Sequence, residues 1–180
     1  RILEASRLFR LTGETRYAVW AASQIDLYAE NYLRWPMQTR EGKSRMFAQA
    51  LDEATAIARL VPAVRLLRDH AGAERVSRWK ERLFYPIVDN LRASDVGLNN
   101  ISLWHAAAMT EVGLLFADEP LVREGLDGSK GIRTILKTGV TADFIWFEGS
   151  LGYQTYILRA LSPLFIEASL LGRGAELRRE

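Results

Sequence analysis

The sequence contains no cysteine, only two histidines and no long apolar run. Without cysteine, the 180-residue chain can form no disulfide framework, no thiol nucleophile and no Cys-ligated zinc site. No apolar stretch approaches the roughly 20 residues that a membrane-spanning helix needs. His70 and His105 lie far apart and show no metal-ligand spacing, so we expect neither a metal nor a cofactor.

The chain also lacks a strong excess of charge of one sign. Its 24 Lys and Arg oppose 22 Asp and Glu, which gives a formal net charge of +2. That balance argues against a nucleic-acid-binding protein, which normally gathers basic residues on one face. The chain begins RILEA, with neither a secretory signal nor an initiator Met, so we interpret it as a piece of a longer protein.

Apolar residues recur with a helical period along most of the chain. The pattern predicts helices over residues 1–11, 15–30, 44–60, 62–71, 73–92, 101–116, 119–126, 130–138 and 152–171. Ser44 is the expected N-cap of the third helix, Pro62 opens the fourth, and Pro86 kinks or divides the fifth. The one strand-like stretch, residues 143–147, predicts a small hairpin beside the helices. Helix pairs recur at intervals of roughly 45 residues, which predicts an all-α fold of stacked helical hairpins.

Unusual residues gather around Trp35, at Asn99–His105 and over residues 147–156. Two adjacent asparagines, Asn99 and Asn100, precede a predicted helix. One of them is expected to cap it, which leaves the other free to donate to an anion at the helix N-terminus. His105 either packs as a buried core residue or lines a cleft, where it carries a positive charge or a hydrogen bond to an acid.

The segment EGSLGY, residues 148–153, predicts the start of the last long helix. Ser150 is the expected N-cap, and Tyr153 then stands in the first turn. A tyrosine there either packs as a core or interface aromatic or, near Arg side chains, takes part in proton transfer.

Four segments together resemble the heparinase II/III and oligoalginate lyase group of polysaccharide lyases. They are residues 99–105 (NNISLWH), 112–115 (VGLL), 126–128 (LDG) and 146–153 (WFEGSLGY). The resemblance implies an incomplete (α/α) toroid followed by a β-sandwich, with the active site between them. We therefore expect residues 1–180 to form a single toroid domain of a longer lyase whose C-terminal β-sandwich is absent.

The resemblance also implies the chemistry, which is cleavage of a uronate polysaccharide by β-elimination without a cofactor. The carboxylate beside C5 must be neutralised before that carbon loses its proton. By resemblance, Asn99 or Asn100 neutralises it, with the spacing slightly favouring Asn99. Tyr153 takes the proton or protonates the leaving oxygen, and His105 supports the site from deeper on the same helix.

Further residues are candidates for substrate binding. Arg45 and Gln49, four apart on a predicted helix face, are candidates for binding the uronate or its neighbours. Trp35 is a candidate for stacking on a sugar ring, and the segment around Tyr153 adds Glu148 and Gln154. Gln154 stands where many relatives have His, and a further catalytic His that such lyases supply from the β-sandwich has no counterpart in this chain.

Two other functions remain open at this point. A glycoside hydrolase on a similar toroid would need two opposed carboxylates, such as Asp95 and Glu148. A non-catalytic helical scaffold would leave Asn99, Tyr153 and Trp35 apart rather than in one cleft. The sequence also leaves the uronate polymer open, with alginate oligomers and heparin or heparan sulfate as candidates. The compartment stays open between bacterial periplasm and cytoplasm.

Overall fold

The computed structural model describes residues 1–177, and these residues confirm the predicted all-α fold. The helices are α1 (Ile2–Thr12), α2 (Thr15–Asn31), the short 3-10 turn η1 (Tyr32–Arg34), α3 (Ala50–Ala71), α4 (Ala73–Trp79), the π-helical turn η2 (Lys80–Phe84), α5 (Tyr85–Arg92), α6 (Asn100–Phe116), α7 (Glu119–Asp127), α8 (Ile132–Gly139), α9 (Leu151–Leu170) and α10 (Gly174–Leu177). Within the described residues, extended pairing is limited to isolated bridges. No helix of that part is long and apolar enough to cross a membrane.

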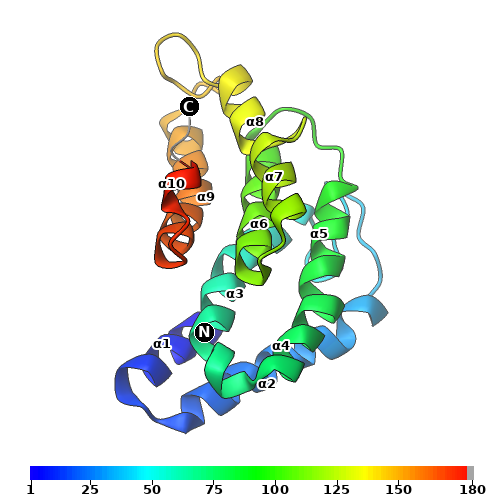
Figure 1. Ribbon diagram of the computed structural model, residues 1–180. Helices are drawn as coiled ribbons and strands as arrows, with labels where there is room; N and C mark the ends of the chain where they lie inside the picture. The colour runs from blue at the N-terminus through cyan, green and yellow to red at the C-terminus, as the bar shows by residue number, and fades with distance from the viewer. Residues whose placement is uncertain (178–180) are drawn as a thin grey trace.

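Three long helices, α3, α6 and α9, lie side by side and run in the same direction (Figure 1). Near their N-terminal ends, the Trp104 ring of α6 packs on Tyr156 of α9, with the ring centroids 5.3 Å apart. Near the C-terminal ends, Arg65 of α3 donates to Glu167 of α9 over 2.6 Å. The helix N-termini therefore meet at one end of the molecule.

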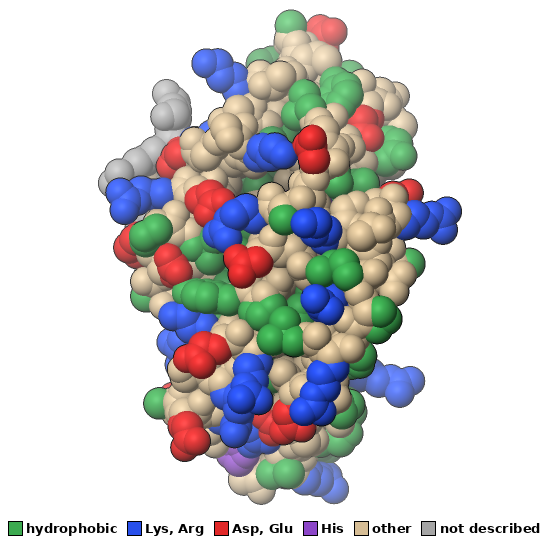
Figure 2. Space-filling model, turned by 90° about the vertical axis from the view of Figure 1, so that its right-hand side faces the viewer, with side chains coloured by type: hydrophobic (Ala, Val, Ile, Leu, Met, Phe, Trp, Pro, Cys, Tyr) green, Lys and Arg blue, Asp and Glu red, His purple; other side chains and the backbone are tan. Residues whose placement is uncertain are grey.

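The connecting helices α5 and α7 run the opposite way (Figure 1). Tyr85, at the start of α5, donates to Asp118, the N-cap of α7, and Arg92, at the end of α5, pairs with Glu124 in the second half of α7. The three long helices thus form one parallel layer, and α5 and α7 lie in a second layer whose helices run antiparallel to the first. On the face shown in Figure 2, side chains of both charge signs are interspersed around a band of apolar side chains.

The loop between η1 and α3 folds around one buried carboxylate, that of Glu53. It accepts hydrogen bonds from the Tyr32 hydroxyl (2.7 Å), the Ser44 hydroxyl (2.9 Å) and the backbone N–H groups of Arg45 (2.6 Å) and Met46 (2.8 Å). A helix over residues 44–60 would direct these donors along its own axis instead.

The predicted start of the third helix is therefore wrong, because α3 begins at Ala50. Arg45 and Gln49 lie in the preceding loop and share no helix face.

Pro62 does not open a new helix either, because it lies inside α3. The lost hydrogen bond costs about 3 kcal/mol. The neighbouring Val61 and Val64 are fully buried, and their burial is worth about 1.5–3 kcal/mol each, which offsets that cost.

Pro86 divides its helix as predicted, since the π-helical turn η2 ends just before it and α5 begins with it in the first turn. The expected hairpin at residues 143–147 is present only in minimal form. One antiparallel bridge, between Val140 and Trp146, closes a turn, and no regular strand forms there. Phe144 adopts a φ of 60°, which is incompatible with a regular strand.

Two glutamates are buried where α3, α6 and α9 pack together. Glu167 is held by Arg65 through two hydrogen bonds of 2.6 and 3.1 Å. Glu111 is buried as well, but its carboxyl oxygens have no hydrogen-bond partner within the described residues. Burial, and then the negative charge of Glu167, raise the pKa of Glu111 well above its ordinary value of 4.5.

We predict that Glu111→Gln makes the protein more stable at pH 7 and flattens the pH dependence of its unfolding free energy. The neutral Glu111 carboxyl keeps its full stabilising effect below pH 4.5, and that effect is lost as the pH rises toward the raised pKa of the folded state. The variant has no such proton to lose, so its advantage should shrink as the pH falls toward 4.5.

Urea unfolding at a series of pH values measures this. As a matched control, Glu167→Gln breaks the ion pair with Arg65 and should cost about 2 kcal/mol at pH 7. If wild type and Glu111→Gln lose stability in parallel as the pH rises, the assignment of a raised pKa to Glu111 is wrong.

Candidate functional site

Several of the candidate residues lie at the end of the molecule where α6 and α9 begin (Figure 1). Asn99 and Asn100 open α6, and Ser150 and Tyr153 open α9. The backbone N–H groups at a helix N-terminus carry partial positive charge and favour an anion. This end of the molecule therefore suits a ligand that carries carboxylates.

Asn99 is the residue that caps α6, which confirms that one of the two asparagines has this role. Its Oδ1 accepts from the backbone N–H groups of Ile101 (2.9 Å) and Ser102 (3.1 Å). The Ser102 hydroxyl in turn accepts a hydrogen bond from the Asn99 backbone N–H, which completes a capping box. The Asn99 amide nitrogen donates to the Val96 carbonyl over 2.7 Å.

Asn100 is buried and binds Glu148. Its backbone N–H donates to Glu148 over 2.9 Å, and its Nδ2 lies 3.0 and 3.1 Å from the two carboxylate oxygens. The Trp146 indole donates to the same carboxylate over 2.5 Å, and the Trp146 backbone N–H donates to Gln154 over 2.7 Å. Glu148 thus holds the segment before α9 against α6, Gln154 holds it against α9, and both side chains are engaged within the protein.

Tyr153 stands in the first turn of α9, as expected, and Ser150 caps the helix by accepting from the Tyr153 backbone N–H over 3.1 Å. The Tyr153 side chain is 45% exposed. It lines a shallow cavity of about 330 Å³ together with Ser150, Gly152 and Tyr156. No hydrogen bond joins its hydroxyl to any part of residues 1–177, so this group is available to a ligand.

Tyr156 is a site residue that the sequence reasoning missed. It lines the same cavity one helical turn beyond Tyr153, and the i, i+3 spacing of the two tyrosines was the available signal. Its pKa is raised, first by burial and then by the negative charge of Asp52. Asp52 lies in the first turn of α3, so the start of this third helix is also close to the cavity.

His105 does not line the Tyr153 cavity. Its side chain is 5% exposed and borders a separate cavity of about 240 Å³ between α6, α7 and the loop at Val96. Burial, and then the positive charge of Lys130, lower its pKa to about 4. His105 is therefore neutral at pH 7, and the interpretation in which it carries a positive charge is wrong for this structure. Its Nε2 finds no hydrogen-bond partner in the described chain.

The upstream candidates lie in the loop before α3, away from the Tyr153 cavity. The Arg45 guanidinium donates to the backbone carbonyl of Trp35 over 2.5 Å. The Trp35 ring packs edge-on against Tyr28 and Tyr32, with centroids 5.9 and 6.4 Å away. Gln49 precedes α3 without capping it through its side chain. None of the three candidates lines the cavity that Tyr153 lines.

The carboxylates needed for hydrolysis are not aimed into that cavity either. Asp95 is exposed and pairs with Lys130 over 3.0 Å, which lowers the pKa of Asp95. The Glu148 carboxylate already accepts hydrogen bonds from Asn100 of α6 and from the Trp146 indole. Within the described residues, no three His, Asp or Glu side chains gather in a way that could hold a metal ion.

Comparison with known proteins gives two relatives of similar kind. No family model matches the chain. The chain is 26% identical over 189 aligned residues to an alginate lyase of Stenotrophomonas maltophilia, with 99% of this chain and 25% of that protein covered. It is 25% identical over 169 residues to an exo-oligoalginate lyase of Saccharophagus degradans, with 87% and 23% covered. The chain spans about a quarter of the length of the curated relatives it matches.

We predict that Asn99→Ala lowers the unfolding free energy by about 1 kcal/mol, because α6 loses its N-cap. Asn99→Ser should restore most of that loss, since serine caps helices nearly as well. Denaturant unfolding of the three proteins at one pH measures the difference. An Asn99→Ala variant as stable as Asn99→Ser would contradict the capping role.

Proposed function

We propose that this chain is the helical part of a polysaccharide lyase that cleaves a uronate polymer by β-elimination. Similarity to two proteins named as alginate lyases supports a polysaccharide lyase in general. The observation that carries the proposal is the position of Tyr153. Its exposed hydroxyl has no partner within residues 1–177 and stands where the N-terminal ends of three parallel helices meet.

In the proposed reaction, a base removes the proton from C5 of the uronate, the C4–O bond breaks, and a C4=C5 double bond forms. The departing O4 receives a proton, so one proton leaves and one is delivered. Tyr153 is the proton carrier at this site, because a phenol beside the sugar can accept or donate a proton. Its half-exposed position leaves room for a sugar in the adjoining cavity.

The proton at C5 becomes acidic enough only when the neighbouring carboxylate is neutralised by hydrogen bonds. The proposal assigns this task to the Asn99 amide at the start of α6, where the helix N-terminus favours negative charge. The Asn99 amide nitrogen has two hydrogens and uses one on Val96, so the second can reach a substrate. The Asn100 amide is already in contact with both oxygens of Glu148.

The remaining catalytic groups belong, in this proposal, to the rest of a longer protein. The chain covers about a quarter of its relatives. We assign residues 1–180 to one toroid domain and place a β-sandwich C-terminal to it, so that the substrate, an anionic polysaccharide or oligosaccharide, binds between the two.

We predict that Tyr153→Phe in the full-length protein lowers kcat by about 10²–10⁴-fold and leaves KM nearly unchanged, because only the proton carrier is lost. Tyr156→Phe is the matched control, since it removes a hydroxyl from the same cavity one turn away, and it should keep most of the activity.

Initial rates of reducing-end formation, measured separately with alginate oligomers and with heparan sulfate, test this. Wild-type turnover by Tyr153→Phe would remove Tyr153 from the mechanism. Equal losses in both variants would show that the cavity needs intact packing rather than a specific proton carrier.

A further inference from the structure

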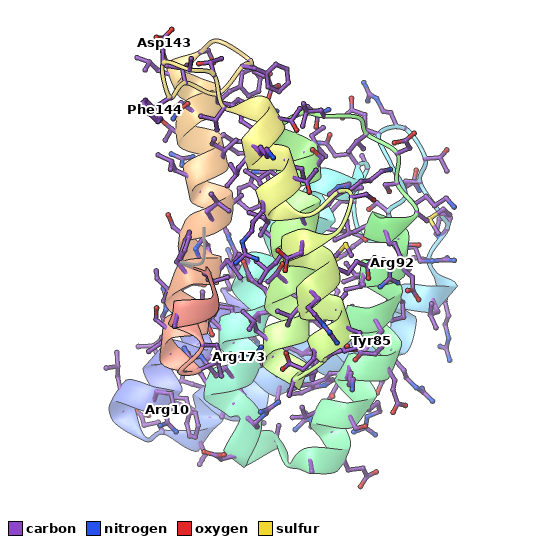
Figure 3. All side chains as sticks on the ribbon, turned by 45° about the horizontal axis from the view of Figure 1, so that its top comes forward. Arg10, Tyr85, Arg92, Asp143, Phe144 and Arg173 are labelled. Atoms are coloured by element: carbon purple, nitrogen blue, oxygen red, sulfur yellow. The ribbon has the colours of Figure 1, made fainter. Side chains whose placement is uncertain are left out.

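The loop between α8 and α9 carries an aromatic side chain in a strained position. Phe144 adopts a φ of 60°, in the left-handed region that L-residues other than Asn and Asp seldom enter. Its side chain is 84% exposed and makes no ring contact with the described residues. Figure 3 shows Phe144 and Asp143 in this loop, at the end of the molecule where α9 begins. Strain of this kind persists where the surroundings enforce it, and such positions cluster at ligand contacts.

The base of the loop is firmly held. Thr141 and Ile145 pair through a backbone hydrogen bond of 2.9 Å, and Phe144 donates back to Thr141 over 2.9 Å. Trp146 is fully buried below the loop, and its ring packs so closely on Gly139 that a Cβ there would lie 2.3 Å away. These contacts fix the base of the loop, so the exposed position of the Phe144 side chain is part of the folded structure.

The loop also belongs to the same segment as the candidate site. Glu148 ties the segment to Asn100 at the start of α6, and Gln154 ties it to the first turns of α9. Phe147 and Tyr153, each 45% exposed, follow Phe144 along this segment. Phe144 and Phe147 therefore belong to the segment that leads directly into the first turn of α9, where Tyr153 lines its cavity.

We propose that Phe144 is a sugar-contacting residue, whose ring stacks on the C–H face of a hexuronate residue of an anionic oligosaccharide that extends from the Tyr153 cavity. The inference rests on the proposed function. Asp143, beside Phe144, repels a carboxylate. The uronate carboxylate therefore points away from the loop tip, toward the helix N-termini, and the apolar sugar face meets the ring.

The size of the exposed surface favours a sugar over a protein partner. One aromatic side chain offers about 150–250 Å². A stable protein interface takes about 800 Å² from each partner. Even with the half-exposed Ile145 and Phe147, the apolar side chains of the loop fall well short of that area.

Four proteins test the proposal: the full-length wild type and its Phe144→Ala, Phe144→Gly and Ala117→Gly variants. Ala117 is the matched control, since it also has a positive φ, of 54°, but lies in the α6–α7 turn at the other end of α6. Binding of a trimannuronate is measured by calorimetry with Tyr153→Phe added to all four proteins, so that the ligand is not cleaved during the titration, and Tm is measured by thermal unfolding.

Both Phe144 variants should weaken trimannuronate binding by about tenfold, because each removes the ring. Phe144→Gly and Ala117→Gly should both raise Tm, because glycine relieves the strained φ. Ala117→Gly should bind as the wild type does.

Unchanged affinity in Phe144→Ala and Phe144→Gly, with a wild type that binds, would overturn the role of Phe144 alone. A wild type that binds neither trimannuronate nor a heparan sulfate oligosaccharide would overturn the proposed function and this inference together.

Discussion

The position of the candidate site depends on one carboxylate, that of Glu148. It accepts hydrogen bonds from the backbone and side chain of Asn100 and from the Trp146 indole. These contacts join the start of α6 to the segment that leads into α9. A carboxylate is suited to this place, because the partial positive charge of a helix N-terminus and charge-assisted hydrogen bonds both stabilise its negative charge. The location of Tyr153 and the shape of the loop that carries Phe144 both follow from this junction.

The core below supports the same geometry by a different means. The Arg65–Glu167 pair and the packing of Trp104 on Tyr156 connect the long helices at opposite ends of their contact. Parallel helices bring their positive ends together, which is unfavourable unless anions lie nearby. Glu148 and Asp52 provide part of that negative charge at this end of the molecule, and a bound uronate would provide more.

Local patterns were enough to predict the helices and their caps. Apolar periodicity placed most helix boundaries within two residues, and the roles of Asn99 and Ser150 as helix caps depend only on neighbours in the chain. The failures have long-range causes. The start of α3 was misplaced because Glu53 captures donors from the preceding loop and from Tyr32, 21 residues away. The partner of Asn100 lies 48 residues along the chain, and no local rule predicts that pairing.

The substrate-binding residues were predicted less well than the fold for the same reason. Arg45, Gln49 and Trp35 were chosen by an expected helix face and by loop composition. In the structure, Arg45 donates to the Trp35 carbonyl, and the Trp35 ring packs against Tyr28. The sequence left His105 open between a buried core residue and a cleft-lining one. The structure shows that it is buried beside a cavity separate from that of Tyr153, and that burial keeps the imidazole neutral. The place of Tyr153 in the first turn of α9 follows from the local sequence, whereas only the structure shows that its side chain is exposed.

The most direct test of the account is to digest alginate oligomers and heparan sulfate with the full-length protein in ¹⁸O-labelled water. The products are then examined by ultraviolet absorbance and mass spectrometry. At early times, before reducing-end oxygens exchange with solvent, β-elimination predicts a rising absorbance from the new conjugated double bond and products that have gained no solvent oxygen. Products that gain one labelled oxygen without a rise in absorbance would show hydrolysis, and would contradict the account.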